Sequence, residues 1–472
     1  MKRVFNFSFS NSNKARVIAP GLKKVMLFVM VLIGCERAMA QQQPVVLQLK
    51  DALNYALNAS QNARKAKLDV ENSQYQIDEV RARALPQITG AGAINYNPLL
   101  QLSALPGELN AANPGQTMLI AFGQKWNANA ALSLSQTLFD KSVFTGLKAA
   151  RTTSEFYRQN LQLTEEQLIE QVATNYYRVL VERQKMSVID STIKITSKVQ
   201  SILQGQYDNG LAKKIDVDRI AVDISNLRSR RQQLINGLAL LENQLKFYMG
   251  MPIETPITIP DAALADIQPR AIPLNDTVSL EGRTELAVLS TQESLLKYQR
   301  EAYTAEYYPS LSLSGSYSYQ GLSNKFPVFK GQTNGANWFD VASVGLNLRV
   351  PIFNGGATRS RLRQADVSIR KLQEDISQTR LSLNLAYENA KTQINNSIIT
   401  LNSQKANVEL AQEIFFNTQN NYNNGLAPLT DLLSAENSLT EAQNNYSEAL
   451  LNYRVAEIQL IKSQGTLKTL LN

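Results

Sequence analysis

The feature that most constrains the fold is an internal duplication. Three sequence marks occur in the same order in both halves of the 472-residue chain, about 215 residues apart. The marks are 85–88, 132–139 and 207–216 in the first half, and 308–311, 346–353 and 422–431 in the second. The third is the clearest, because Tyr207-Asp-Asn-Gly-Leu-Ala returns as Tyr422-Asn-Asn-Gly-Leu-Ala. A period this long exceeds that of a solenoid repeat and indicates a duplicated domain.

The marks and the proline positions predict how the chain is divided. We expect a first repeat over 41–250, a proline-rich connector over 251–279 and a second repeat over 280–472. Each repeat is predicted to open with a helix, over about 47–84 and about 280–307, because proline follows at the end of each segment and stops a helix.

Each half also contains a stretch that predicts one very long helix. Residues 141–207 have no proline and two glycines, and residues 357–422 have neither proline nor glycine. A helix of about 65 residues is roughly 100 Å long at 1.5 Å per residue. We therefore expect helices over 141–207 and 357–422, each followed by a tip turn, at 207–216 and at 422–431.

Apolar residues recur every seven positions along both long helices. They are Val181, Val188, Ile195 and Ile202 in the first helix, and Ile394, Leu401, Val408, Phe415 and Tyr422 in the second. This heptad spacing is typical of a coiled coil. Many Asn, Gln, Ser and Thr residues separate these positions, so the apolar seam is narrow. Such helices suit a thin-walled tube with water on both sides better than a globular core.

Four segments alternate apolar and polar residues with a period of two, which predicts strands. They cover about 87–96, 126–137, 311–320 and 341–350. Ten tilted residues cross a bilayer, and an aromatic girdle is expected near the ends of such strands, where Trp126, Trp338, Tyr317 and Tyr319 lie. A strand of a soluble sandwich would alternate in the same way. Four strands cannot close a membrane barrel, so in the membrane reading the chain shares its barrel with copies of itself.

The N-terminal segment 1–40 reads as a signal peptide, with a basic start, an apolar core over 25–33 and an Ala-Met-Ala site ending at Ala40. Cys35, the only cysteine, follows Leu-Ile-Gly as in a lipobox, so lipidation of Cys35 is the alternative to its removal. The chain has a net charge of +8, but segment 1–40 holds seven cations and one acid. The rest is almost neutral, and we expect no nucleic-acid partner.

The composition also argues against catalysis. The chain has no histidine, and it keeps no cysteine if the signal peptide is removed at Ala40. Histidine-based triads and histidine zinc sites are therefore excluded, and we expect no enzyme, no cofactor and no bound metal. After residue 40 no stretch approaches 18 apolar residues, so no membrane-spanning helix is predicted and a membrane location would require a barrel.

The two tip turns carry the residues that we single out. Gly210 and Gly425 each follow an asparagine, which fits a helix end with one left-handed residue. Asp216 and Asp431 then stand at the start of the returning helix, where a carboxylate can accept free backbone N–H groups. A helical hairpin without any further function would show the same pattern.

With its marks in this order, the chain resembles the TolC-type outer membrane efflux family (the outer membrane factors) over nearly its whole length after residue 40. The matching features are the duplicated half, two strands per half, the two Tyr-x-x-Gly turns and four local patterns. These patterns are Leu49-x-x-Ala52-Leu53-x-x-Ala56-Leu57, Tyr248-Met-Gly-Met-Pro252, and the strand ends at Phe139 and Phe353.

The resemblance implies an α+β membrane protein that works as a homotrimer. Each protomer would give four transmembrane strands to a twelve-stranded β-barrel in the outer-membrane lipid, and its long coiled-coil helices would form an α-helical barrel through the periplasm. The trimer would be the passive exit duct of a tripartite efflux system or a type I secretion system. A periplasmic adaptor (membrane fusion) protein would dock at the tips, and an inner-membrane pump would supply the energy.

The resemblance also implies a gate at the periplasmic tips, formed by Tyr207, Gly210, Asp216, Tyr422, Gly425 and Asp431. In the family an aspartate at the tip can belong to an acidic ring, and Tyr and Arg side chains can hold the closed state. Asp431 matches the outer of two acidic positions, and Tyr422 matches the tyrosine. Ser434 stands where a second acid can occur and Ala427 where an arginine can occur, so a tyrosine latch is expected and an arginine latch is not.

A second hypothesis is a periplasmic coiled-coil spacer or adaptor protein that forms no pore. It accounts for the long helices but gives no role to the four amphipathic strands. The cargo, the adaptor and the pump cannot be deduced from these residues.

Overall fold

The computed structural model describes residues 45–106, 108, 115–260, 273, 277–326 and 336–471. The predicted signal peptide and Cys35 lie outside these residues and stay predictions. The elements of the first half are β1 (Val45–Val46), α2 (Leu49–Ala59), α3 (Gln61–Ala82), β2 (Gln87–Tyr96), β3 (Leu102–Leu105), β4 (Met118–Ala121), β5 (Trp126–Phe139), α4 (Lys141–Asp208) and α5 (Lys214–Met249). Those that follow are β6 (Ile257–Thr258), α6 (Thr284–Ala305), β7 (Ser310–Ser323), β8 (Asn337–Arg349), α7 (Ala357–Asn423), α8 (Leu429–Ser463) and a 3₁₀ helix (Leu467–Leu471).

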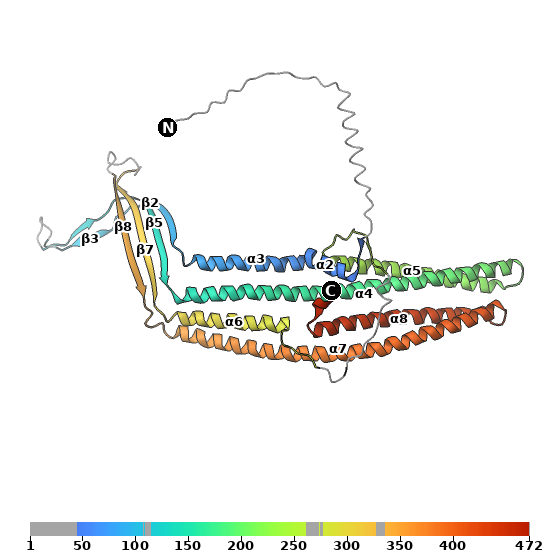
Figure 1. Cartoon of the computed structure of the whole chain (residues 1–472). Helices are drawn as coiled ribbons and strands as arrows, with labels where there is room; N and C mark the ends of the chain where they lie inside the picture. The colour runs from blue at the N-terminus through green and yellow to red at the C-terminus, as the bar shows by residue number, and fades with distance from the viewer. Residues whose placement is uncertain are drawn as a thin grey trace, which may run out of the picture.

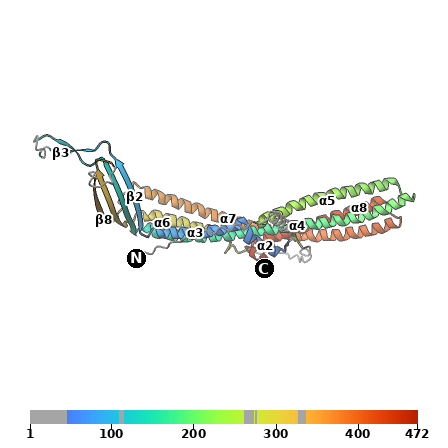
Figure 2. The same cartoon turned by 90° about the horizontal axis from the view of Figure 1, so that it is seen from above.

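The molecule is long and thin, with a small sheet at one end and two helical turns at the other (Figure 1). Helices α4 and α7 have 68 and 67 residues and run the whole distance between them. Helices α3 and α6 lie along the half next to the sheet, and α5 and α8 lie along the half that ends at the turns. In this second half the contacting pairs are α5 with α4, α4 with α8 and α8 with α7, which gives the order α5, α4, α8, α7. Helices α5 and α7 form the two flanks (Figure 2).

The sheet joins the two halves of the chain. Its order is β2-β5-β7-β8, all neighbours are antiparallel, and the halves meet where β5 pairs with β7. Residues opposite one another share a face. Ser133, Ser316 and Ser343 pair on one face, and Leu132, Tyr317 and Ala342 pair on the other. The predicted alternation is therefore present as one polar face and one apolar face.

Aromatic side chains gather at the end of the sheet away from the helices. The rings of Tyr319 and Trp338 stack at 4.9 Å, and those of Tyr96 and Trp126 lie 4.6 Å apart. The Trp338 ring covers Gly321 of the neighbouring strand so closely that a Cβ at this glycine would lie 2.5 Å from the ring. The predicted grouping of aromatic residues at strand ends thus exists, and Gly321 provides the space for it.

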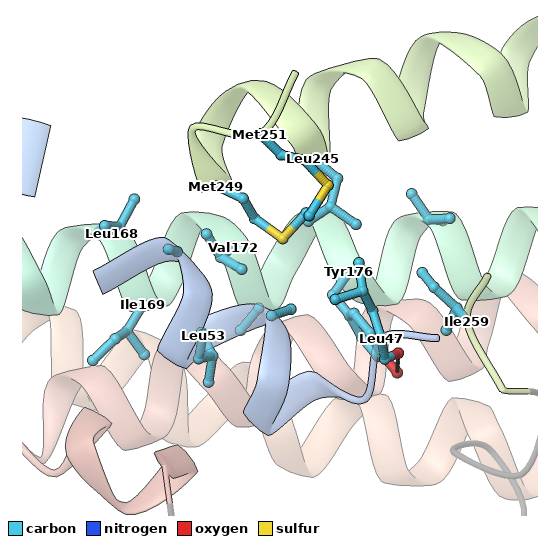
Figure 3. Close-up of a cluster of buried hydrophobic side chains, with 14 of the residues drawn as sticks. Leu47, Leu53, Leu168, Ile169, Val172, Tyr176, Leu245, Met249, Met251 and Ile259 are labelled. Carbon is cyan, nitrogen blue, oxygen red and sulfur yellow. Dashed lines mark hydrogen bonds between the residues drawn. The ribbon is translucent and has the colours of Figure 1, made fainter. Parts of the chain in front are cut away.

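The largest apolar core lies in the middle of the molecule, where α2 packs on α4 beside the end of α5 (Figure 3). Leu53, Val172 and Met249 are fully buried there. The start of the connector belongs to this core, because Ile257 and Ile259 are buried in it and β6 pairs with β1 in parallel. The Tyr176 hydroxyl donates a hydrogen bond to the Leu47 carbonyl at 3.2 Å and so ties α4 to the chain before α2.

The expectation of one helix over 47–84 is wrong, because the chain breaks at Ser60 into α2 and α3. Ser60 has an extended backbone, and the backbone of Gly250 at the end of α5 lies against it. A Cβ at Gly250 would lie 2.6 Å from the Ala59 carbonyl oxygen, and this glycine has a φ of +72°. The two chain segments can therefore cross only with a glycine at this position.

Two further pairings were not predicted from the sequence. Strands β3 and β4 form a separate antiparallel ribbon, which extends beyond the sheet (Figure 1). Strands β1 and β6 form the parallel pair in the central core. Each of these strands has only two or four residues, too few to show a period of two.

The predicted seam of α7 is confirmed at Ile394, Leu401 and Phe415, which are buried. The predicted seam of α4 is wrong toward the turns, because Ile195 and Ile202 are 38% and 48% exposed. The buried residues of this part are Thr192, Thr196 and Leu203. Helix α4 therefore turns a partly polar stripe toward its neighbours there.

None of the described helices is long and apolar enough to cross a membrane.

The Gly250 crossing predicts a large effect of a small substitution. Gly250→Ala forces a side chain into a left-handed conformation and against the backbone at Ala59, so we expect it to lower the free energy of unfolding by about 2–4 kcal/mol. The control is Gly205→Ala in α4, where a Cβ meets no atom within 4 Å. It is expected to raise stability by about 0.5–1 kcal/mol. Urea unfolding, followed by circular dichroism at a helical wavelength, measures the free energy of unfolding of both variants. Equal values would contradict the close contact between Gly250 and Ala59.

Candidate functional site

The two helical turns lie together because an apolar cluster joins their helices. Leu203 of α4, Ile220 of α5, Phe415 of α7 and Leu432 of α8 are all buried in it. Each of the four helices of this half thus contributes to one small core, which we call the tip cluster. The full set of its buried residues is Leu203, Ile220, Phe415, Leu429, Leu432, Leu433 and Ala435.

The two turns have nearly the same geometry. In the first, Gly210 donates to the Tyr207 carbonyl at 2.9 Å and Leu211 donates to the Gln206 carbonyl at 2.8 Å. The second turn repeats this pattern, with donors at Gly425 and Leu426 and bonds of 3.0 and 2.8 Å. Both glycines have a positive φ, +72° and +73°. These are Schellman ends, as the Asn-Gly pairs predicted, and they expose Leu211 and Leu426 at equivalent positions.

The expectation that Asp216 and Asp431 lie at the start of the returning helices is confirmed, but neither carboxylate forms the expected capping bond to backbone N–H groups. Both lie in the first turn, but the capping positions are Lys213 and Pro428, and neither helix has a side-chain capping bond. Each helix starts two residues before its aspartate, so these carboxylates lie in the third helical position. Asp216 instead pairs with Arg219 at 3.6 Å. Asp431 contacts the neighbouring Thr430 hydroxyl, which donates to it at 3.4 Å.

The structure brings together two of the predicted gate residues from different turns, Tyr422 and Asp216. Partial burial raises the pKa of the Tyr422 hydroxyl, and the negative charge of Asp216 raises it further. Tyr422 packs against the tip cluster, whereas Tyr207 is 38% exposed. In the described part of the chain, no hydrogen bond joins either tyrosine hydroxyl to Asp216 or Asp431. In the protomer Tyr422 therefore lies near Asp216, whereas Tyr207 and Asp431 lie on the surface.

Sequence reasoning missed a polar layer on the side of the tip cluster away from the turns. Thr192 and Thr196 of α4 meet Thr440 and Glu436 of α8, and all four are buried. Burial raises the pKa of Glu436 to about 7, a hydrogen bond from Thr196 opposes this rise, and the charge of Asp223 adds to it. A signal existed in the sequence, because Glu436 follows Leu429, Leu432 and Leu433 at helical spacing and so lies on the apolar stripe of α8.

Two leucines of the tip allow a matched test of the cluster. Leu432→Ala leaves a cavity in the tip cluster, so we expect it to lower the local stability of the hairpins by about 2–4 kcal/mol. Leu426→Ala removes the same atoms from a side chain that is 78% exposed and is expected to change it by less than about 0.5 kcal/mol. Hydrogen exchange of residues 429–440 measures both changes. Equal protection in the two variants would show that the cluster does not hold the hairpins together.

Comparison with known proteins agrees with this architecture. The model of the family described as "Outer membrane efflux protein" matches residues 52–251 and 278–466. The outer membrane protein TolC of Salmonella enteritidis is 22% identical over 419 residues, which cover 86% of this chain and 79% of TolC. The alkaline protease secretion protein AprF of Pseudomonas aeruginosa is 24% identical over 320 residues, which cover 66% of this chain and 64% of AprF.

The crystal structure of the outer membrane protein VceC from Vibrio cholerae superposes with a TM-score of 0.64 at 17% identity. The match covers 89% of this chain and 96% of VceC. It shows that the fold is shared over that part of the chain. The family model covers well over half of the residues, in one segment from each half of the duplicated sequence. The chain therefore belongs to the outer membrane efflux protein family.

Proposed function

We propose that the chain is one protomer of a trimeric exit duct in the outer membrane, with residues 41–250 and 280–472 as its repeats and 251–279 as their connector. The observation that carries this proposal is the open sheet. Its strands have 10 to 14 residues, long enough to cross a bilayer when tilted. In the described chain β2 and β8 are its edges. Unpaired edges are not tolerated in lipid, and three copies edge to edge would close a barrel of twelve strands.

The two faces of the sheet support the same arrangement. The apolar face exposes Leu132, Val344 and Leu346 to the outside of the protomer. The opposite face carries serine and asparagine side chains. Lipid on the first face and water on the second would satisfy both. A spacer without a pore would leave an apolar sheet face uncovered in the periplasm, so we favour the duct over that alternative.

The flanks of the helical half also fit a ring of copies. The exposed apolar residues Val222 and Leu240 lie on α5, and Ile399 and Ile414 lie on α7. At 1.5 Å per residue, Leu240 is about 39 Å from the start of α5 and Ile399 about 36 Å from the end of α7. In the same way, Val222 is about 12 Å from the start of α5 and Ile414 is about 14 Å from the end of α7. Packing α7 of one copy against α5 of the next would bury these residues at matching heights in a head-to-tail ring.

The gate of the proposed duct is the tip, with Tyr207, Gly210, Asp216, Tyr422, Gly425 and Asp431. Transport is passive, and packed helix ends close the duct. An adaptor protein that binds an open arrangement better than the closed one would shift the population toward the open duct, and an inner-membrane pump would supply energy. The relatives include a protease secretion protein, so the cargo we propose is either a secreted protein or small molecules that are exported by efflux.

The oligomer is the first test of the proposal. Native mass measurement on detergent-extracted outer membranes is expected to give a trimer. Leu240→Glu places a charge on the α5 flank and is expected to shift the protein toward monomers. Leu211→Glu changes an equally exposed leucine at the turn, away from both flanks, and is expected to leave the trimer intact. A monomer from the periplasmic extract of the unchanged protein would favour the spacer.

Conductance tests the gate. The double change Tyr422→Phe with Asp431→Ala removes a hydroxyl and a carboxylate from the tip, so we expect a severalfold rise in single-channel conductance in a planar bilayer. Tyr75→Phe changes a 62% exposed tyrosine on α3 and serves as the control. Unchanged conductance in the double variant would remove these two residues from the gate.

A further inference from the structure

A buried polar layer lies between α4 and α8, where the two hairpins of the protomer meet. It consists of Thr192 and Thr196 on α4 and of Glu436 and Thr440 on α8, which are between 0% and 7% exposed. The α4–α8 contact links the two hairpins of the protomer, and the tip cluster lies on one side of the layer. Any motion that parts the two hairpins must therefore break this layer.

The hydrogen bonds of the layer depend on whether Glu436 carries a proton. Thr196 Oγ1 lies 2.8 Å from the Thr192 carbonyl oxygen and 2.5 Å from Glu436 Oε1. A hydroxyl has one hydrogen. An ionised Glu436 must take that hydrogen from Thr196, whereas a neutral Glu436 can donate its own hydrogen and leave that of Thr196 for the Thr192 carbonyl, as buried helical threonines do. Glu436 can donate only as a neutral carboxylic acid.

The threonine pair beside it obeys the same count. Thr192 Oγ1 lies 3.1 Å from the Val188 carbonyl oxygen and 3.2 Å from Thr440 Oγ1. Thr192 can give its hydrogen to the carbonyl while Thr440 donates to Thr192. The whole layer is then satisfied with one hydrogen per hydroxyl and a proton on Glu436.

The charges around Glu436 favour the neutral form. On α5, the half-buried Asp223 is the group whose charge acts on Glu436. The lysines of α4 at this level, Lys194 and Lys198, are exposed, as are Glu409 and Glu413 of α7 and Asp431 and Glu441 of α8 itself. Burial and a neighbouring carboxylate both raise the pKa of an acid, in accord with the value of about 7 for Glu436.

We propose that Glu436 in its neutral form is a positioning residue that holds α8 against α4, so that loss of its proton favours the open duct. The proposal rests on the channel function proposed above. It adds a proton-sensitive contact inside each protomer, separate from the predicted gate residues at the turns.

The direction of the pH effect follows from linkage. The pKa of Glu436 is about 7 in the packed layer and 4.5 for a free glutamate, so the packed layer binds the proton more tightly than the parted one. The contact is strongest below pH 4.5, weakens as pH rises toward 7, and changes little above 7. A difference of this size corresponds to a change on the order of 100-fold in the ratio of open to closed duct.

The test is the pH profile of channel opening in planar bilayers between pH 4.5 and 8.5. The unchanged protein is expected to open increasingly up to about pH 7. Glu436→Gln is neutral at every pH and keeps an N–H donor, so this variant is expected to lose that rise and to stay mostly closed at pH 8. Glu441→Gln removes an exposed carboxylate of the same helix and is expected to keep the rise. A Glu436→Gln profile equal to that of the unchanged protein would overturn the proposal.

A second readout does not depend on conductance. Hydrogen exchange of residues 432–445, compared between the unchanged protein and Glu436→Gln at each pH, is expected to be equal near pH 5 and faster in the unchanged protein at pH 8. Thr196→Val removes the partner hydroxyl and is expected to raise exchange already at pH 5. A protein that never conducts would contradict the proposed duct, and the hydrogen exchange of residues 432–445 would still test the role of Glu436. Normal conductance with identical hydrogen exchange in both proteins would reject the proposed role of Glu436 and leave the proposed duct unaffected.

Discussion

Helices α4 and α7 run for about 100 Å and each buries only a narrow stripe of its surface, which limits what the chain can build. A helix of this kind can line a wall but cannot be surrounded by other helices. The side-by-side order α5, α4, α8, α7 is such a wall, one helix thick. Its largest apolar core lies where extra elements, α2, β1 and β6, thicken the wall in the middle. Helices α5 and α7, which carry exposed apolar residues, are the edges of this wall, as β2 and β8 are the edges of the sheet.

Most of the long helices and the strands of the main sheet were predictable from local sequence patterns. Absence of proline over a long stretch predicts a helix, and a period of two over ten residues predicts a strand, since both signals are local. The turns were also predictable, because Asn-Gly at a helix end leaves few backbone conformations. The break at Ser60 could not be predicted in this way. It depends on contact with Gly250, about 190 residues further along the chain, and the local sequence from 49 to 82 contains no proline or glycine that would indicate a break.

The seam of α4 shows a second limit. A heptad count selects the apolar residues Ile195 and Ile202, but burial follows the neighbours that the fold supplies. In the structure Thr192 and Thr196 are buried against α8, whereas Ile195 and Ile202 are 38% and 48% exposed. Threonine can occupy a buried helical position because its hydroxyl can bond to the carbonyl four residues earlier. The exposed isoleucines, in turn, are explained if the protomer is incomplete without its neighbours.

The distribution of charge along the molecule indicates where selection by charge could act. Within the four strands, the polar face carries mainly hydroxyl and amide side chains and a single charged residue, Arg349, at its helix end, while Val341 and Phe339 lie toward its other end. In the proposed trimer three copies of Arg349 would form one ring of like charges at the helix end of this face, and the rest of the face would oppose polar solutes of neither sign. At the tips, by contrast, Asp216 and Asp431 lie near the surface on helices that the proposed gate would separate. Discrimination by charge would then occur at the same place as gating, and the neutral Glu436 behind it would control access without itself adding a charge to the closed pore.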